Sequence, residues 1–167
     1  MKEGNIEYRP FQNGDEREVY AVVLKSWRHA YGGIYSPEFI ENFINTHYAP
    51  EKLRSLLPKL KKGEMFFQVA INNNRNKIVG FCNIGDRGEG MELFRIYLLP
   101  SYIGKGIGKR LLQLGEEFIK SKGINKYFCY VHKNNQLGIN FYLKSGFKHI
   151  SKRDKEKDDE WCMEKEL

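Results

Sequence analysis

The chain has 167 residues, of which 41% are hydrophobic and 14% aromatic, a composition typical of a folded protein and unlike that of a disordered one. Its length suits a single domain over residues 1–167 with a substantial core. The 28 Lys and Arg residues outnumber the 21 Asp and Glu residues, and the net charge is +7. This excess suits an anionic ligand, but no long basic block occurs, so nucleic acid is not expected as the main partner.

Cysteine usage and hydropathy restrict the class of protein further. Cys82, Cys129 and Cys162 are far apart and form no CxxC pair, which argues against a disulfide framework or a zinc site. We predict that the first two are small core residues within strands. No apolar run is long enough to span a membrane, and the polar residues 1–7 lack the apolar region of a signal peptide. The cytoplasm is therefore the simplest location, with no membrane partner.

Periodicity predicts the elements in chain order. A strand at 6–12 precedes a helix at 15–30 capped by Asp15, a helix that begins with Ser36 as N-cap and Pro37 in its first turn, and a helical piece at 50–61. Alternating patterns then predict strands at 65–71, 77–85 and 91–98. A helix to about residue 122, a strand at 127–132, a helix at 135–145, and strands at 147–151 and 160–166 follow. The charged run 152–159 is interpreted as a solvated hairpin loop.

This order predicts an α/β fold of the α+β type. Three strands in an antiparallel meander, followed by strand–helix–strand, imply a mixed and mostly antiparallel sheet of about seven strands, with helices on both faces.

Three glycines alternate in the turn before the helix that ends near residue 122. Gly104, Gly106 and Gly108 let the backbone bend tightly and let a ligand approach closely. The following helix presents free N–H groups and the positive end of its dipole to this turn. Basic side chains flank the turn at Lys105, Lys109 and Arg110. The arrangement is typical of a site for a phosphate-bearing ligand, although it matches neither GxxxxGK[ST] nor GxGxxG.

Two runs resemble motifs of the GNAT N-acetyltransferase superfamily. LLPSYIGKGIGKRLL, at 98–112, resembles the acetyl-CoA-binding motif [QR]xxGx[GA], which lies between a strand and a helix. NQLGINFYLKSGF, at 135–147, resembles the NxxAxxFYxxxGF segment. The resemblance covers nearly the whole chain, although the first 60 residues match only in pattern. The chain departs from the family at Ile103, where Gln or Arg is usual, and at Gly138, where Ala is usual.

The resemblance implies a binding mode for acetyl-CoA. The pyrophosphate would rest on the backbone of the glycine turn, which comprises Ile103, Gly104, Lys105, Gly106, Ile107, Gly108 and Lys109. The pantetheine arm would pair with the strand backbone at Ile96, Tyr97 and Leu98, and the N–H near Leu98 would face the thioester carbonyl. Asn135 would cap its helix and also bind the cofactor.

The resemblance also implies an enzyme that moves an acetyl group directly from acetyl-CoA to a primary amine. Tyr142 matches the tyrosine that protonates the leaving thiolate, although it could instead be a core aromatic. Glu92 is the candidate general base, with a solvated strand-end carboxylate as the alternative. Ordered water and His132 are further candidates for the base. A non-catalytic, regulatory acyl-CoA-binding module is the alternative function.

Aromatic residues cluster around Gly32 and Gly33. Trp27, Tyr31 and Tyr35, together with Phe39, either form a wall of the acceptor site or pack the helices together. The Trp-xxx-Tyr-Gly-Gly pattern resembles a bacterial subgroup that includes polyamine acetyltransferases. The acceptor could be a polyamine, another small amine or a peptide amine. The sequence leaves open whether Glu38, Glu41 and Glu92 converge, and whether the protein forms a homodimer.

Overall fold

The computed structural model of the chain describes residues 5–167. Within that range seven strands form one sheet in the order β1-β2-β3-β4-β5-β7-β6. The strands are β1 (Ile6–Pro10), β2 (Met65–Asn72), β3 (Lys77–Asp86), β4 (Met91–Leu98), β5 (Lys126–His132), β6 (Lys148–His149) and β7 (Glu160–Glu166). The helices are α1 (Glu16–Tyr31), α2 (Pro37–Tyr48), α3 (Pro50–Arg54), α4 (Leu57–Lys61), α5 (Ile107–Ser121) and α6 (Gln136–Lys144). Neighbouring strands are antiparallel except β4 and β5, which are parallel, so the mixed, mostly antiparallel sheet is confirmed.

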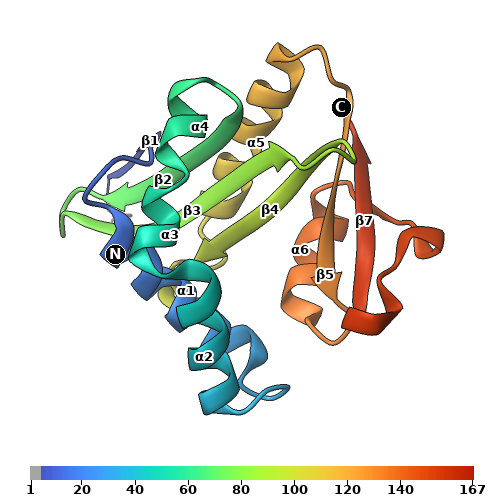
Figure 1. Cartoon of the computed structure of the whole chain (residues 1–167), viewed down its shortest axis with the longest axis horizontal. Coiled ribbons are helices and arrows are strands. Elements are labelled where there is room, and N and C mark those ends of the chain that lie inside the picture. Colours follow the sequence, from blue (N-terminus) through green and yellow to red (C-terminus); the bar gives the residue numbers. More distant parts are fainter. Residues whose placement is uncertain (1–4) are drawn as a thin grey trace.

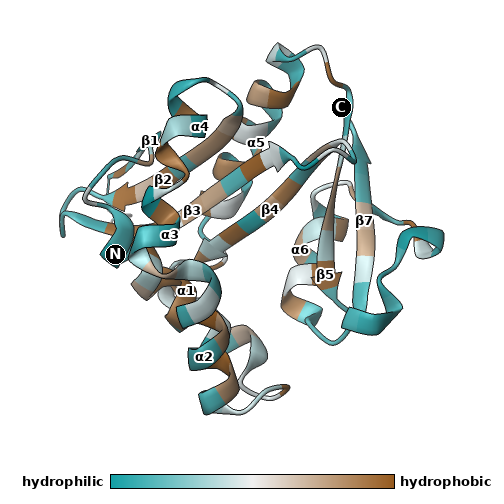
Figure 2. Ribbon diagram, in the orientation of Figure 1, coloured by the Kyte–Doolittle hydropathy of each residue, from teal (hydrophilic) through white to brown (hydrophobic). Residues whose placement is uncertain are grey.

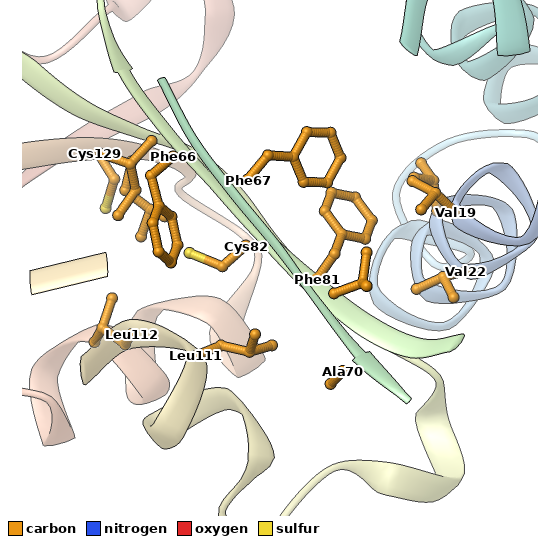
Figure 3. Packing of buried hydrophobic residues seen from close by; sticks show 14 of the residues in the cluster. Val19, Val22, Phe66, Phe67, Ala70, Phe81, Cys82, Leu111, Leu112 and Cys129 are labelled. Carbon is orange, nitrogen blue, oxygen red and sulfur yellow. The ribbon is translucent and has the colours of Figure 1, made fainter. Parts of the chain in front are cut away.

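Helices cover both faces of this sheet, as predicted (Figure 1). Successive side chains of each strand point to opposite faces of the sheet, so the strands supply an apolar layer to each face. Figure 3 shows Val19 and Val22 of α1 on the side of Phe67 and Phe81, and Leu111 and Leu112 of α5 on the side of Phe66 and Cys82. Cys82 and Cys129 are fully buried and unbridged, which confirms them as core residues.

Hydropathy follows the same layers. In Figure 2 apolar residues mark the central strands, and hydrophilic residues mark the connection between β6 and β7. Across residues 5–167, no helix combines the length and the apolar character needed to cross a bilayer.

The start of α1 differs from the expected cap. Asp15 stands at the N-cap position, but its side chain makes no capping hydrogen bond. It instead accepts two hydrogen bonds from the Arg9 guanidinium, at 2.7 and 2.9 Å, and one from the backbone N–H of Gln12 at 2.9 Å. A bidentate, charge-assisted pair is stronger than a neutral cap, and it ties α1 to β1. At α2 the predicted cap is confirmed, because Ser36 accepts from the Phe39 N–H at 3.1 Å.

The helical piece expected at 50–61 is two short helices, α3 and α4. Pro58 explains the break, since proline has no N–H to donate to the Arg54 carbonyl one turn earlier.

The charged run 152–159 connects the antiparallel strands β6 and β7, and six of its eight residues are exposed, so the predicted solvated hairpin loop is confirmed, although the loop has a fold of its own. It contains two turns of 3-10 helix, Ser151–Arg153 and Glu156–Asp158. A hydrogen bond between His149 and Asp154 at 3.0 Å and an ion pair between Arg153 and Glu164 at 2.8 Å hold it against the sheet. The strand expected at 147–151 is shortened to the two residues of β6, because the chain turns into this folded segment.

The sheet opens between β4 and β5. Only one pair joins them, Glu92 with Phe128, although β5 and β7 pair along their whole length. The register between β3 and β4 shifts after Asn83, so that Phe94 is an extra residue on β4. Such a bulge bends the strand, and the buried Asn83 side chain supports it by donating to the Phe66 carbonyl at 2.9 Å. The carboxyl-terminal halves of β4 and β5 therefore diverge (Figure 1).

Candidate active site

The glycine turn lies at the end of β4 and leads into α5. Gly104 and Gly106 have φ angles of +78° and +79°, in the left-handed region that other residues rarely adopt. A Cβ on either residue would meet no atom within 4 Å, so the backbone conformation, and not crowding by neighbours, requires glycine. Gly106 is the N-cap of α5 and supplies no side chain to cap it.

The backbone N–H groups of residues 104–109 are consequently available. None of them donates to an acceptor within residues 5–167, whereas the next N–H, that of Arg110, bonds to the Gly106 carbonyl at 3.0 Å. A row of N–H groups at the start of a 15-residue helix favours an anion. Lys105 lies over the Tyr102 ring at 5.1 Å, and Lys109 is exposed beside the turn. The turn therefore fits a pyrophosphate even with the apolar Ile103 in place of Gln or Arg.

Within residues 5–167, the last residues of β4 leave backbone groups unpaired on the side toward β5. The Leu99 N–H donates to Val79 on β3 at 2.8 Å. Because backbone groups alternate in direction along a strand, Tyr97 faces β3, whereas Ile96 and Leu98 face the diverging side toward β5. An extended chain could pair with β4 at these two residues.

A cavity occupies this diverging region and is called here the first cavity. Its lining includes seven of the residues predicted to bind the cofactor: Ile96, Tyr97, Leu98, Ile103, Gly108, Asn135 and Tyr142. The other five, Gly104, Lys105, Gly106, Ile107 and Lys109, lie on the adjoining turn and do not line it. The side chain of Ile107 is buried in the core, so only its backbone can serve a ligand.

Tyr142 both packs in the core and lines the first cavity. Its ring contacts Phe141 and Phe147, with centroids 5.5 and 5.3 Å away. Burial raises the pKa of the Tyr142 hydroxyl well above its ordinary value. The hydroxyl therefore remains protonated across the neutral range and can act as a proton donor.

Asn135 joins two helices at the same cavity. Its Oδ1 accepts from the Gly138 N–H at 3.0 Å, which confirms the predicted cap, and its Nδ2 donates to the Tyr31 hydroxyl at 3.1 Å. A Cβ at residue 138 would lie 2.9 Å from this Nδ2 and 3.0 Å from a methyl group of Val131. The glycine that replaces the family's usual Ala therefore gives Asn135 room to reach Tyr31.

A second cavity, which adjoins the first, lies between β4, β5 and the α1–α2 region. Trp27, Tyr31, Tyr35 and Phe39 line it from the α1–α2 region, and Glu92 lines it from β4. The aromatic residues also pack on one another, with ring centroids 4.5 Å apart for Trp27–Tyr31 and for Tyr35–Phe39. Both interpretations of the cluster, as helix packing and as cavity wall, therefore hold geometrically. Side chains shared by the two cavities connect them: Tyr31, Phe94, Arg95, Tyr97 and Tyr130.

Glu92, the second residue of β4, lines the second cavity. It is half-buried, and burial raises its pKa, while the charges of Arg87 and Lys155 oppose that shift. A carboxylate with a raised pKa is a better proton acceptor at neutral pH. Glu38 and Glu41 do not join it, since neither lines the cavity and Glu41 pairs with Arg28.

His132 lines the second cavity but is poorly suited to act as a base. Its Nδ1 accepts from the Asn134 N–H at 3.2 Å. In a neutral imidazole this leaves the proton on Nε2, which is then a donor.

Other residues of the two cavities escaped the sequence analysis. Tyr130 could have been found by alternation, because it lies two residues before His132 and shares its face of β5. Lys155 and Glu160 line the second cavity because the charged run folds against the sheet. No local sequence signal predicts that fold.

Residues 17–147 match the model of the Acetyltransferase (GNAT) family, and the chain therefore belongs to this family. The protein is an N-acetyltransferase that uses acetyl-CoA. Membership of this family favours an enzyme over the alternative of a non-catalytic acyl-CoA-binding module.

The chain is similar to a spermidine N(1)-acetyltransferase of Thermoplasma acidophilum, with 37% identity over 86% of this chain and 89% of the relative. Its structure is similar to that of the PaiA N-acetyltransferase of T. acidophilum in complex with coenzyme A, with a TM-score of 0.89 and 35% identity over 98% of this chain and 99% of the other. It is also 31% identical to a [ribosomal protein bS18]-alanine N-acetyltransferase of Haemophilus influenzae, over 64% of this chain and 70% of the relative.

Proposed function

We propose that the protein acetylates a primary amino group of a polyamine or a similar small diamine. The observation that carries this proposal is the half-buried Glu92 in an aromatic cavity that joins the cavity of Tyr142. Aromatic faces and a carboxylate favour an ammonium group. The similarity to a spermidine N(1)-acetyltransferase supports the same substrate class.

The chain's own groups would hold acetyl-CoA at three places. The N–H groups of residues 104–109 would bind the pyrophosphate, with Lys105 and Lys109 adding positive charge. The backbone of Ile96 and Leu98 would pair with the pantetheine arm, and Tyr97 would support it from the strand. Asn135 would bind the cofactor beside Tyr31. The unpaired backbone groups on the turn and on β4 support this placement.

When bound, acetyl-CoA supplies an activated thioester. Glu92, directly or through a water molecule, would remove a proton from the substrate ammonium so that the amine can attack. The Leu98 N–H would stabilise the negative charge that develops on the carbonyl oxygen. Tyr142 would then donate its proton to the leaving sulfur.

The organisation of the chain is part of the same proposal. We place residues 1–167 in one catalytic domain, which the continuous sheet across residues 5–167 supports. We also propose a cytoplasmic location, which is supported by three buried, unbridged cysteines.

An amine panel tests the proposal. Purified protein is incubated with acetyl-CoA and spermidine, spermine, an aminoglycoside, a lysine-bearing peptide or a peptide with an N-terminal alanine, and the release of free thiol is followed. We expect the highest kcat/KM for a polyamine, with a monoacetylated product by mass spectrometry. A higher kcat/KM for a peptide, with no turnover of polyamines, would refute the substrate class.

A further inference from the structure

The ammonium group of Lys155 occupies a position suited to a substrate cation. Its Nζ lies 3.7 Å from the centroid of the Tyr130 ring and 4.0 Å from Oε2 of Glu160. The backbones of Lys155 and Glu160 bond to each other in both directions, at 2.9 and 3.1 Å. This bridge fixes where the Lys155 side chain begins, but its flexible four-carbon stem can swing, because the side chain is 44% exposed.

Two carboxylates of the second cavity feel the charge of Lys155, which lies 4.0 Å from Glu160. Burial raises the pKa of both Glu92 and Glu160, and in each case the Lys155 charge opposes the shift. Glu92 in turn raises the pKa of Glu160, and both carboxylates line the second cavity. A cation in this cavity is therefore favoured, whether it belongs to the protein or to a ligand.

The charges that line the second cavity are balanced. The cationic residues are Arg87, Arg95, Lys155 and Lys157, and the acidic residues are Glu92, Asp158, Asp159 and Glu160. Two of the cations lie on aromatic rings of the wall, Arg87 over Phe94 at 3.9 Å and Arg95 over Tyr48 at 4.6 Å. An additional ammonium group would disturb this balance, whereas one that replaces the Lys155 ammonium would preserve it.

We propose that Lys155 is a specificity-determining residue. In the free enzyme its ammonium group occupies a cation position on the Tyr130 ring. The remote ammonium of a diamine or polyamine displaces the Lys155 ammonium and takes this position. The inference rests on the proposed function and names the second binding position of that substrate. Tyr130 lines both cavities, so a substrate with one amine near Glu92 and Tyr142 can lay its second ammonium on the Tyr130 ring. A monoamine does not reach this position and leaves Lys155 in place.

The substitution Lys155→Met tests the inference, because it keeps the aliphatic stem and the backbone bridge but removes the competing charge. We expect the KM for spermidine to fall about fivefold relative to the KM for butylamine, the scale of one cation–ring contact, because the effect of the Lys155 charge on Glu92 is common to both amines. In the Lys155→Met background, Glu160→Gln should reverse the gain for spermidine.

Lys157→Met is the matched control. Lys157 lines the same cavity, but within residues 5–167 it makes no ion pair and lies over no aromatic ring. An equal fall in this relative KM in the control, or an unchanged or higher spermidine KM relative to butylamine in Lys155→Met, would overturn the inference. If the wild-type protein acetylates other amines but no polyamine, the proposed function fails instead, and the two failures are thereby distinguished.

Discussion

Replacing Tyr142 with Phe should remove the proton donor and leave the surrounding packing in place. The Phe ring keeps the contacts with Phe141 and Phe147, whose centroids lie 5.5 and 5.3 Å away. A positioned general acid contributes about 100-fold or more to the rate, so kcat should fall about 100-fold, or about 2.7 kcal/mol of activation free energy. Because burial raises the pKa of Tyr142 well above its ordinary value, the wild-type enzyme should retain this contribution throughout the neutral range.

Tyr127→Phe is the matched control for this prediction. Tyr127 packs on the same Phe147 ring, but its hydroxyl donates to Glu116 at 2.7 Å and it does not line the first cavity. Loss of that charge-assisted bond should cost about 1.5–3 kcal/mol of folding free energy, and Tm should fall by roughly 4–10 °C. Its kcat should remain at the wild-type value.

The assay measures initial rates of thiol release at varied acetyl-CoA and amine, with Tm by differential scanning fluorimetry. We expect Tyr142→Phe to lose kcat with little change in Tm or in acetyl-CoA affinity, and Tyr127→Phe to show the reverse. A Tyr142→Phe enzyme with undiminished kcat would refute the acid role. A parallel loss of kcat and Tm would show that Tyr142 acts only through the core.

Three further substitutions test other parts of the structure. Glu92→Gln should lower kcat/KM about 100-fold. Wild-type activity should rise with pH as the Glu92 carboxyl group, whose pKa is raised by burial, loses its proton, and the variant should lack this acidic limb of the pH profile. Gly115→Ala places a Cβ 2.3 Å from Cδ1 of Ile84, and this overpacking, at about 1–3 kcal/mol, should exceed the helix-propensity gain of about 1 kcal/mol and lower Tm. Gly138→Ala should displace the Asn135 side chain, 2.9 Å from the new Cβ, and so raise the KM for acetyl-CoA severalfold and lower Tm by a few degrees through loss of the Asn135 cap.

The outcomes that contradict these predictions are equally specific. A Glu92→Gln enzyme with an unchanged pH profile would assign the base to water or another group. Gly33→Ala is the control for Gly115, since its Cβ would meet nothing within 4 Å, and an equal loss of Tm in both variants would contradict the overpacking argument. An unchanged KM for acetyl-CoA in Gly138→Ala would separate Asn135 from cofactor binding.

Local patterns were sufficient to predict much of the fold and part of the candidate site. The alternation in β2, β3 and β4 reflects burial on two faces, and the glycine turn follows from backbone angles that few other residues adopt. Asn135 was predictable as a cap because capping depends on neighbours within one helical turn.

Features that depend on distant partners were not predictable. The Asp15 side chain pairs with Arg9 on β1 and does not cap its own helix, and Lys155, in the connection between β6 and β7, lies over the ring of Tyr130 on β5. The placement of Tyr130 between two cavities depends on how β4 and β5 diverge, which is a property of the whole sheet.

The single pair between β4 and β5 has a consequence for the sheet as an assembly surface. Strands at the rim of a sheet present unpaired backbone groups and can recruit other protein chains, which is a common route to aggregation. Here the second half of β4 is such an edge, but it lies in the middle of the strand order, and residues of α1, α5 and α6 surround it. The protein thus keeps an open edge in its interior, shielded from another sheet but open to a narrow, extended ligand.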